Sequence, residues 1–228
     1  MNQDPNVETV ELTVAALGPL VDELVLVGGC AVGLLLTDTA RAPVRQTTDV
    51  DLLTEVASTA DYHALGSRLR AQGFSEQPTA QVLCRWAKGA LLIDVMPTHA
   101  SVLGFTNSWY AAAVRSAARH LLPSGRSLRL VSAPVFLATK LEAFASRGQG
   151  DFLHHDIEDI VTLVDGRASL HAEVQSAEPD VREFLMDEFD LLLADTTFVE
   201  RMSWHLSPQD QHGRKDIVLG RMREIAGL

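Results

Sequence analysis

Two apolar segments that contain carboxylates constrain the fold of this chain more than any other feature. Asp49 and Asp51 lead into the apolar pair Leu52-Leu53, and Asp94 stands inside the apolar run Leu91–Met96. Successive side chains of a strand point to opposite faces, so Asp49 and Asp51 would share one face while the other face packs into a core. A buried carboxylate is costly without a partner. If the two strands are neighbours, all three acids meet.

These carboxylates predict a metal site. Two strand rises separate Asp49 from Asp51 by about 7 Å, so their charges repel unless a cation lies between them. Oxygen-rich sites of this kind suit Mg²⁺ or Mn²⁺. Three acids on adjacent strands can hold two such ions, which stabilise the attacking and leaving oxygens of a phosphoryl or nucleotidyl displacement. We therefore predict Asp49, Asp51 and Asp94 as metal ligands. The alternative is a strand end with two solvated acids.

A pair of glycines precedes these acids. Gly28 and Gly29 link a strand expected at Leu24–Val27 to a helix expected at Cys30–Leu36. Such a turn lets backbone amides approach an anion, and the N-terminus of a helix favours negative charge. An ordinary tight turn can have the same sequence, so the pair alone does not indicate an anion site. It does so together with the acids that follow about twenty residues later.

Charge is distributed unevenly along the chain and indicates two parts. No acid occurs from Val95 to Leu141, whereas Asp151 to Glu200 contains fourteen acids and two arginines. We predict an α/β (α+β) fold with a mixed-sheet core at residues 1–131 and a helical C-terminal domain at residues 132–228. The first part is expected to contain helices at Glu8–Leu17, Cys30–Leu36, Thr59–Gly73 and Ala112–Leu121, and strands at Leu24–Val27, Val50–Leu53, Gln81–Ala87, Ala90–Met96 and Leu128–Val131.

The net charge of −11 argues against a protein whose whole surface binds nucleic acid. A local basic patch is still compatible with this negative net charge. Arg115 and Arg119 are four residues apart on an expected helix, and Trp109 and Tyr110 stand just before them. This stripe is either a solvated helix face or an acceptor groove for RNA, in which arginines meet phosphates and a base stacks on an aromatic ring.

The sequence predicts a cytoplasmic chain that does not enter membranes. Its longest apolar run, Leu24–Leu36, is interrupted by glycines and is too short to cross a bilayer. The N-terminal residues are polar and acidic, unlike a secretory signal. Cys30 and Cys84 are isolated in apolar stretches, which favours two small buried residues over a zinc site or a disulfide.

Several motifs together resemble one known family. They are, in chain order, Gly28-Gly29, Arg45-x-Thr47-x-Asp49-x-Asp51, Asp94, Lys140-Leu-Glu-Ala-Phe144, Arg147-Gly148 and His155-Asp156-Ile-Glu-Asp-Ile160. This set is similar to the motifs of the AbiEii-type nucleotidyltransferases, which belong to the DNA polymerase β-like superfamily and are known mostly as toxins of type IV toxin–antitoxin systems. The resemblance spans Leu24 to Arg167.

The resemblance implies a polymerase β-like core and a reaction. A nucleoside triphosphate such as ATP would bind between the two parts, and an acceptor hydroxyl on RNA, tRNA or protein would displace pyrophosphate. Mg²⁺ or Mn²⁺ would be the cofactor, and a cognate antitoxin would be a possible partner. The implied roles are triphosphate binding for Gly28, Gly29, Arg45 and Thr47, metal binding for Asp49, Asp51 and Asp94, phosphate contact for Lys140, and an active-site acid at Asp156.

Some positions allow other interpretations. Family members often place Arg before the acid at position 156, where this chain has His155, which would bind phosphate only partly at neutral pH. On one helix, His155 and Asp159 would share one face, and His154 and Glu158 another. No single face then collects three ligands, which speaks against a zinc or iron site. Lys140 could instead be an ordinary helix lysine with a solvated head. Rival functions are nucleotidylation of an aminoglycoside-like antibiotic and a nucleotide-binding or partner-binding module without turnover.

Overall fold

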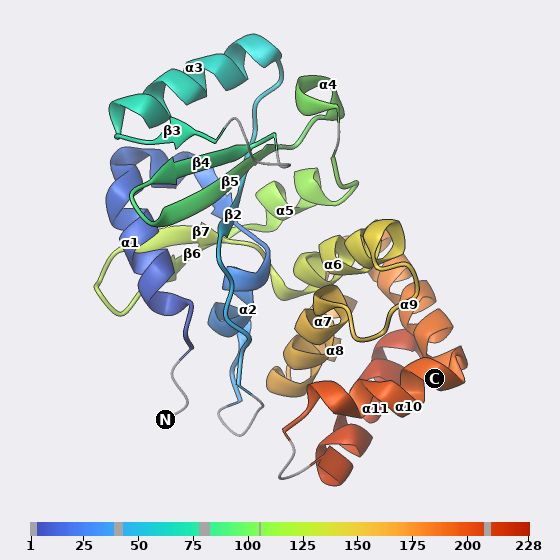
Figure 1. The fold of residues 1–228 in the computed structure, drawn as a ribbon. Coiled ribbons are helices and arrows are strands. Elements are labelled where there is room, and N and C mark those ends of the chain that lie inside the picture. Colours follow the sequence, from blue (N-terminus) through green and yellow to red (C-terminus); the bar gives the residue numbers. More distant parts are fainter. Residues whose placement is uncertain (1–3, 39–42, 78–82, 105, 208–210) are drawn as a thin grey trace. The chain divides into compact units, whose positions relative to one another are not determined.

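The computed structural model describes residues 4–38, 43–77, 83–104, 106–207 and 211–228 (Figure 1). The chain forms two compact units. The sheet unit consists of residues 5–34 and 45–132. The helical unit consists of residues 133–228 together with 1–4 and 35–44, as far as these are described. Among the described residues, no helix combines the length and the apolar character that crossing a membrane requires.

The sheet unit is built on a seven-stranded mixed sheet in the order β3-β4-β5-β2-β1-β7-β6. β1 pairs with β7 and β2 pairs with β5 in parallel, and the other neighbours are antiparallel. This sheet, combined with the helices, confirms the predicted α+β class. The strands are β1 (Leu24–Leu26), β2 (Val50–Thr54), β3 (Ser75–Glu76), β4 (Arg85–Lys88), β5 (Leu91–Pro97), β6 (Ala118–Leu121) and β7 (Ser127–Leu130).

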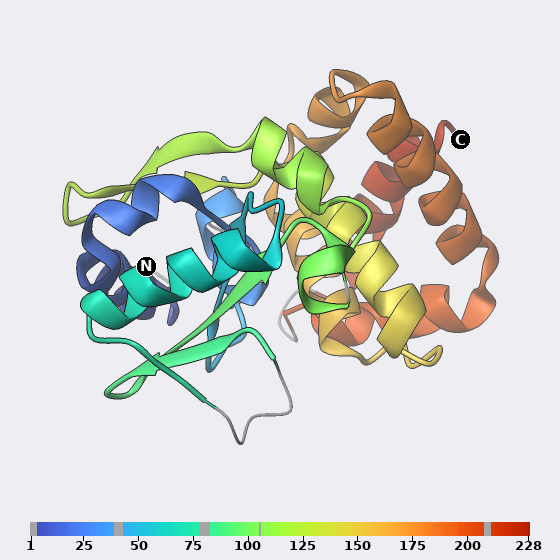
Figure 2. The ribbon, with the colours of Figure 1, turned by 90° about the horizontal axis from the view of Figure 1, so that it is seen from above.

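Short helices connect and cover these strands. They are α1 (Val7–Leu17), the 3-10 helix η1 (Gly18–Glu23), α2 (Gly29–Leu35), α3 (Thr59–Ala71), α4 (Ala100–Leu103) and α5 (Tyr110–Ser116). α3 lies along the β3–β4 side of the sheet in both views (Figures 1 and 2). Gly66 leaves room there for the ring of Trp86, and the Tyr62 hydroxyl donates to the carbonyl of Val95 at 2.8 Å. Ser58 caps α3 by accepting a hydrogen bond from the amide of Asp61.

The helix expected at Ala112–Leu121 is half wrong. α5 ends at Ser116, and residues 118–121 form the edge strand β6, which pairs with β7. Ala-rich sequence favours a helix locally, but pairing with a strand that follows later in the chain overrides that preference. Arg115 therefore lies on a helix and Arg119 on a strand, so they do not form one helical stripe. Arg119 is also ion-paired with Asp22 at 2.8 Å.

The strand expected at Gln81–Ala87 is shifted toward the C-terminus in the part that is described. β4 includes Arg85–Lys88, and residues 81 and 82 lie outside the described residues. Lys88 pairs with Leu91, so the hairpin turn is Gly89-Ala90, one residue later than the gap Lys88-Gly89 between the two expected strands. The positive φ of Gly89, +60°, explains why a glycine is needed at the first turn position.

The helical unit contains α6 (Ala133–Arg147), α7 (His155–Gly166), α8 (Leu170–Gln175), α9 (Pro179–Ala194), α10 (Thr196–Arg201), the 3-10 helix η2 (Met202–His205) and α11 (Gln211–Ala226). Pro134 and Pro179 lie in the first turns of α6 and α9, where the missing amide proton of proline costs no helical hydrogen bond. α7 is the central helix, because Ile157, Ile160 and Val164 are fully buried. α11 packs against α7 and α9, and Figure 2 shows α11 in red beside α9 in orange.

Part of the first half of the chain belongs to this helical unit. The amides of Thr37 and Asp38 both donate to the carbonyl of Gly166 at the end of α7, at 2.9 Å. Asp38 also accepts from Arg214 on α11. Residues 35–44 are thus grouped with residues 133–228, whereas the charge pattern placed everything up to residue 131 in the first part. Hydrogen bonds between segments so far apart have no signature in the local sequence.

Candidate active site

The two-glycine turn lies directly against other predicted site residues. Gly28 has φ +66°, and a Cβ atom built on it would be 1.8 Å from Oδ2 of Asp51. A Cβ atom on Gly29 would be 2.5 Å from Cγ2 of Thr47 and 2.7 Å from a guanidinium nitrogen of Arg45. The absence of side chains at both positions is therefore what allows Asp51, Thr47 and Arg45 to approach this backbone. All five residues were predicted from the sequence to bind nucleotide or metal.

A buried asparagine holds the segment that carries Arg45 and Thr47. The side-chain amide of Asn6 donates to the carbonyl of Arg45 and accepts from the amide of Thr47, each at 2.9 Å. The Thr47 hydroxyl also lies 2.8 Å from Sγ of Cys30, at the start of α2. Asn6 is 1% exposed. Sequence reasoning missed Asn6, because an isolated asparagine near the N-terminus has no motif around it.

The three predicted acids lie together on neighbouring strands. β2 and β5 are parallel, and Asp51 and Asp94 are directly paired in their register. Asp49 immediately precedes β2. Asp94 is 5% exposed, so its carboxylate is buried as the apolar run around it predicted. β2 and β5 are therefore neighbours in the sheet unit, which is the arrangement that brings the three acids together.

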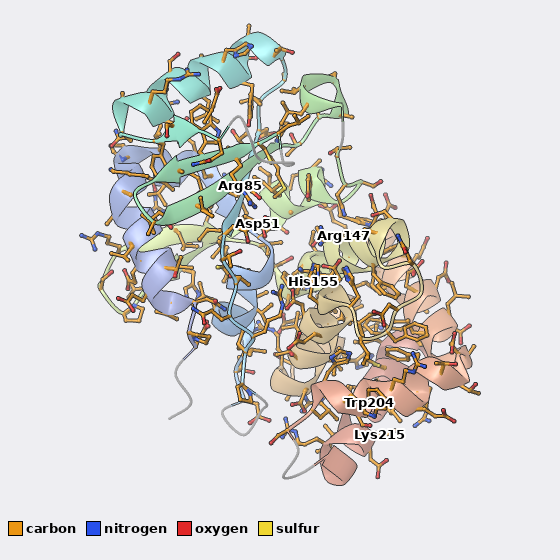
Figure 3. The ribbon with its side chains drawn as sticks, viewed as in Figure 1. Asp51, Arg85, Arg147, His155, Trp204 and Lys215 are labelled. Atoms are coloured by element: carbon orange, nitrogen blue, oxygen red, sulfur yellow. The ribbon has the colours of Figure 1, made fainter. Side chains whose placement is uncertain are left out.

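An arginine that sequence reasoning missed completes this acid cluster. Arg85 lies opposite Asp94 in the β4–β5 register. Its Nε and one terminal nitrogen donate to the two oxygens of Asp94 at 2.8 and 2.7 Å, and the same terminal nitrogen also donates to Asp49. Figure 3 shows Arg85 and Asp51 in the same region of the sheet unit. A lone cation in the apolar stretch Val82–Ala87 was the signal that could have identified it.

The electrostatics of this cluster favour a charged guanidinium and a neutral thiol. The hydrogen bond to Asp94 raises the pKa of Arg85 further above its usual value, so the guanidinium stays charged. Burial raises the pKa of the neighbouring Cys84 to about 12, with added contributions from Asp94 and Asp51. Cys84 is therefore a protonated, buried side chain and not a nucleophile.

In the helical unit, Lys140 and Asp156 form a buried ion-pair network. The Lys140 ammonium lies 3.1 Å from Oδ1 of Asp156 and 2.6 Å from Oδ2 of Asp159. Arg147 donates to both oxygens of Asp156 at 2.8 Å. The Lys140 side chain is 7% exposed, so it is not a helix lysine with a solvated head. The carboxylates of Asp156 and Asp159 therefore balance the positive charge of Lys140 within the helical unit.

Burial acts differently on the two neighbouring titratable groups of α7. Burial opposes ionisation of Asp156, but Arg147 and Lys140 outweigh it and lower the pKa of this carboxyl to about 2. Burial also lowers the pKa of His155 below its usual value, against the opposing effect of Asp156. His155 is therefore a weaker phosphate-binding cation at neutral pH than the sequence analysis allowed.

The first turn of α7 also contains a potential metal cluster that sequence reasoning discounted. One ligand atom from each of His154, His155 and Asp156 lies within 4.8 Å of the others. The expectation that no three ligands of this stretch come together is wrong, because His154 precedes the helix as its N-cap. However, both oxygens of Asp156 accept from Arg147, and Nδ1 of His154 accepts from the amide of Asp156. A metal ion would have to displace these contacts.

A cavity of about 440 Å³ also lies in the sheet unit, beside the C-terminal end of β2. Its lining includes Thr54, Arg68 and Arg129, and none of the three clustered acids. Arg129 donates to the carbonyl of Val114 at 2.9 Å, and Arg68 is paired with Glu23. The chemistry of the acid cluster therefore does not involve this cavity.

Comparison of the sequence with models of known protein families and with curated proteins gave no match.

The acid cluster fits a hard divalent cation. Its donors are carboxylate oxygens, the ligands that Mg²⁺ and Mn²⁺ prefer. Arg85 already shows that Asp49 and Asp94 converge closely enough to share one positive group. The carboxylate of Asp51 lies against the Gly28 backbone, beside the turn whose amides are candidates for contact with an anion. A cation and an anionic ligand can thus be bound side by side.

Replacing Gly28 by Ala tests the close approach of Asp51. The Cβ atom would collide with that carboxylate, and the positive φ would add about 1 to 2 kcal/mol of strain. Gly89→Ala is the matched control, because Gly89 has φ +60° and nothing within 4 Å of its Cβ position. We expect both variants to lose stability in chemical denaturation through the strained φ, Gly28→Ala the more because of the added collision, and Gly28→Ala alone to lose Mn²⁺ binding. Equal Mn²⁺ affinity in the two variants would contradict this geometry.

Proposed function

We propose that this protein is a metal-dependent nucleotidyltransferase. The observation that carries the proposal is the in-register pair of Asp51 and Asp94 on adjacent parallel strands, with Asp49 just before one of them. The two-glycine turn lies in contact distance of the same cluster. Three converging acids beside an anion-compatible turn are what transfer of a nucleoside monophosphate from a triphosphate requires. The order of the motifs resembles the AbiEii-type enzymes, which supports the same reaction.

In this proposal each predicted site residue of the sheet unit has a role. Asp49 and Asp51 hold Mg²⁺ or Mn²⁺, and Asp94 either completes the ligand set or accepts the proton of the attacking hydroxyl. The amides around Gly28 and Gly29 contact the triphosphate, and Arg45 offsets its charge while Thr47 positions the loop. A bound divalent ion supplies charge stabilisation at the phosphate oxygens. The acceptor oxygen bonds to the α-phosphorus as the bond to pyrophosphate breaks, and the hydroxyl proton leaves to a base.

The roles of Lys140 and Asp156 are proposed from the motif resemblance. Their contacts within the helical unit support a positioning role more strongly than direct phosphate contact. Lys140 already faces two carboxylates, and Asp156 faces two cations, so neither charge needs a ligand for its neutralisation. Arg45 is consequently the better candidate for binding the triphosphate.

The reaction can be tested with labelled substrates. The protein is incubated with each α-labelled nucleoside triphosphate, Mg²⁺ or Mn²⁺, and in turn total cell RNA, cell protein or an aminoglycoside. We expect metal-dependent transfer of label to one acceptor class, with RNA or tRNA first, and equimolar release of pyrophosphate. Transfer to RNA or protein would also justify a search for an antitoxin encoded nearby. The absence of label and of pyrophosphate with every combination would contradict the proposal.

A nucleotide-binding module without turnover is the second candidate. One observation favours it: Arg85 already neutralises part of the acid cluster, as a cation would in a site that no longer binds metal. The two candidates differ in one respect that can be measured. A binding module retains triphosphate affinity but releases no pyrophosphate with any acceptor or metal.

A further inference from the structure

Arg85 reaches across two neighbouring strands to contact two of the acids. Its position on β4 places it opposite Asp94 on β5, which explains the bidentate pair as a cross-strand contact. The additional bond to Asp49 is different, because Asp49 precedes β2, on the far side of β5. An ion pair that only joined β4 to β5 would not need the hydrogen bond from Arg85 to Asp49. Arg85 therefore binds the acid cluster in the way a cation would, through Asp94 and Asp49.

The charges of this cluster show what that contact does. Three carboxylates carry −3, and Arg85 reduces the sum to −2. A bidentate guanidinium binds both oxygens of Asp94 and one oxygen of Asp49 in a fixed planar geometry. A divalent ion held by Asp49 and Asp51 would lie near this fixed positive charge, and their repulsion is only partly screened because the Arg85 side chain is 21% exposed.

We propose that Arg85 is a built-in competitor of the metal, so that the nucleotide-free protein binds one divalent ion through Asp49 and Asp51 while Arg85 retains Asp94. This inference rests on the proposed function, because it describes how the same acid cluster takes up its metal. A single divalent ion brings the cluster of three acids and Arg85 to zero net charge. A second ion then requires the negative charge that a triphosphate brings, or the departure of Arg85 from Asp94.

The test measures Mn²⁺ binding by calorimetry and by electron paramagnetic resonance, without nucleotide. We expect the wild type to bind one Mn²⁺ and Arg85→Gln to bind Mn²⁺ about ten-fold more tightly or to bind a second ion, because a neutral amide removes the competing charge. Arg68→Gln is the control, since Arg68 forms an exposed pair with Glu23 in the same unit. Its Mn²⁺ affinity should equal that of the wild type. An unchanged or weakened affinity in Arg85→Gln would overturn the inference.

A second variant keeps the test valid if Arg85→Gln does not fold. Arg85→Lys retains the charge but lacks the planar fork, so one ammonium cannot hold both oxygens of Asp94 and reach Asp49 in the same way. We expect its Mn²⁺ affinity to lie between those of the wild type and Arg85→Gln, a few-fold above the wild type. Affinity equal to or below the wild type in a folded Arg85→Lys protein would count against competition.

The outcomes also separate this inference from the proposed function. Asp51→Asn is introduced into both the wild type and Arg85→Gln, and should abolish the tight Mn²⁺ site in each. If no protein binds Mn²⁺ at millimolar concentration, the proposed function and the inference both fail. If Mn²⁺ binding depends on Asp51 but not on Arg85, the metal site stands and only the competition is refuted.

Discussion

Asp51→Asn is expected to reduce nucleotidyl transfer by roughly 1000-fold, because it removes a metal-binding charge worth several kcal/mol in the transition state. Asn has nearly the same shape as Asp, so the contact with Gly28 is preserved. The change leaves the Arg85 pairs with Asp49 and Asp94 in place. Repulsion among the clustered acids falls in the metal-free protein, so the thermal midpoint should stay equal or rise.

Initial rates of pyrophosphate release at saturating Mg²⁺ measure this effect. Asp22→Asn is the matched control, because Asp22 is an exposed acid of the same unit that pairs with Arg119. That variant should retain wild-type transfer. An Asp51→Asn enzyme that retains near wild-type turnover at high Mg²⁺ would refute the role of the acid cluster in metal binding.

Lys140→Met is expected to destabilise the helical unit by about 3 to 5 kcal/mol, because it leaves Asp156 and Asp159 buried with one countercharge fewer. A helix lysine with a solvated head would lose little stability on this change, since Met retains the apolar stem of Lys. The buried network reverses that expectation. Lys140→Met combined with Asp159→Asn should recover part of the loss, because it also removes the buried charge that the Lys140 ammonium faced at 2.6 Å.

Urea denaturation of the single and double variants measures this coupling, with Lys215→Met on α11 as the control in the same unit (Figure 3). The control should remain within about 0.5 kcal/mol of the wild type. A Lys140→Met protein as stable as the control would contradict the structural role of the network. Wild-type stability combined with lost turnover would instead favour direct contact between Lys140 and the triphosphate.

The same network predicts a pH dependence of stability. The carboxyl of Asp156 has a pKa of about 2 in the folded protein, below its usual value of 3.8. Its stabilising contribution, about 2 kcal/mol, is therefore fully present above pH 4 and is lost as the pH falls toward 2. Asp156→Asn should lack this part of the acid dependence when unfolding is followed between pH 2 and 5. An identical pH profile in the variant and the wild type would contradict the assignment.

Patterns within single segments predicted much of the fold and most of the acid cluster. Alternation along Asp49–Leu53 and the lone carboxylate of Asp94 sufficed to place three acids on two strands, because strand geometry fixes which side chains share a face. The glycine turn was predictable for the same reason, since few residues tolerate that backbone. Features whose cause lies within a few residues are accessible from the sequence.

Features that depend on distant segments were not predictable in this way. Arg85 gains its role from strand order, which brings β4 beside β5, and Asn6 gains its role from a loop about forty residues later. β6 forms because β7 is available as a partner, despite a locally helical sequence. The ion pairs of Lys140 likewise require α6 and α7 to pack before the charges meet.

Diffraction from crystals of the protein with Mn²⁺ and a non-hydrolysable nucleoside triphosphate tests the central claim most directly. Anomalous scattering locates the manganese independently of the phasing. We expect manganese between the carboxylates of Asp49 and Asp51, with the triphosphate against the Gly28-Gly29 turn. Manganese at His154, His155 and Asp156, or nucleotide bound with no metal at the three acids, would contradict it.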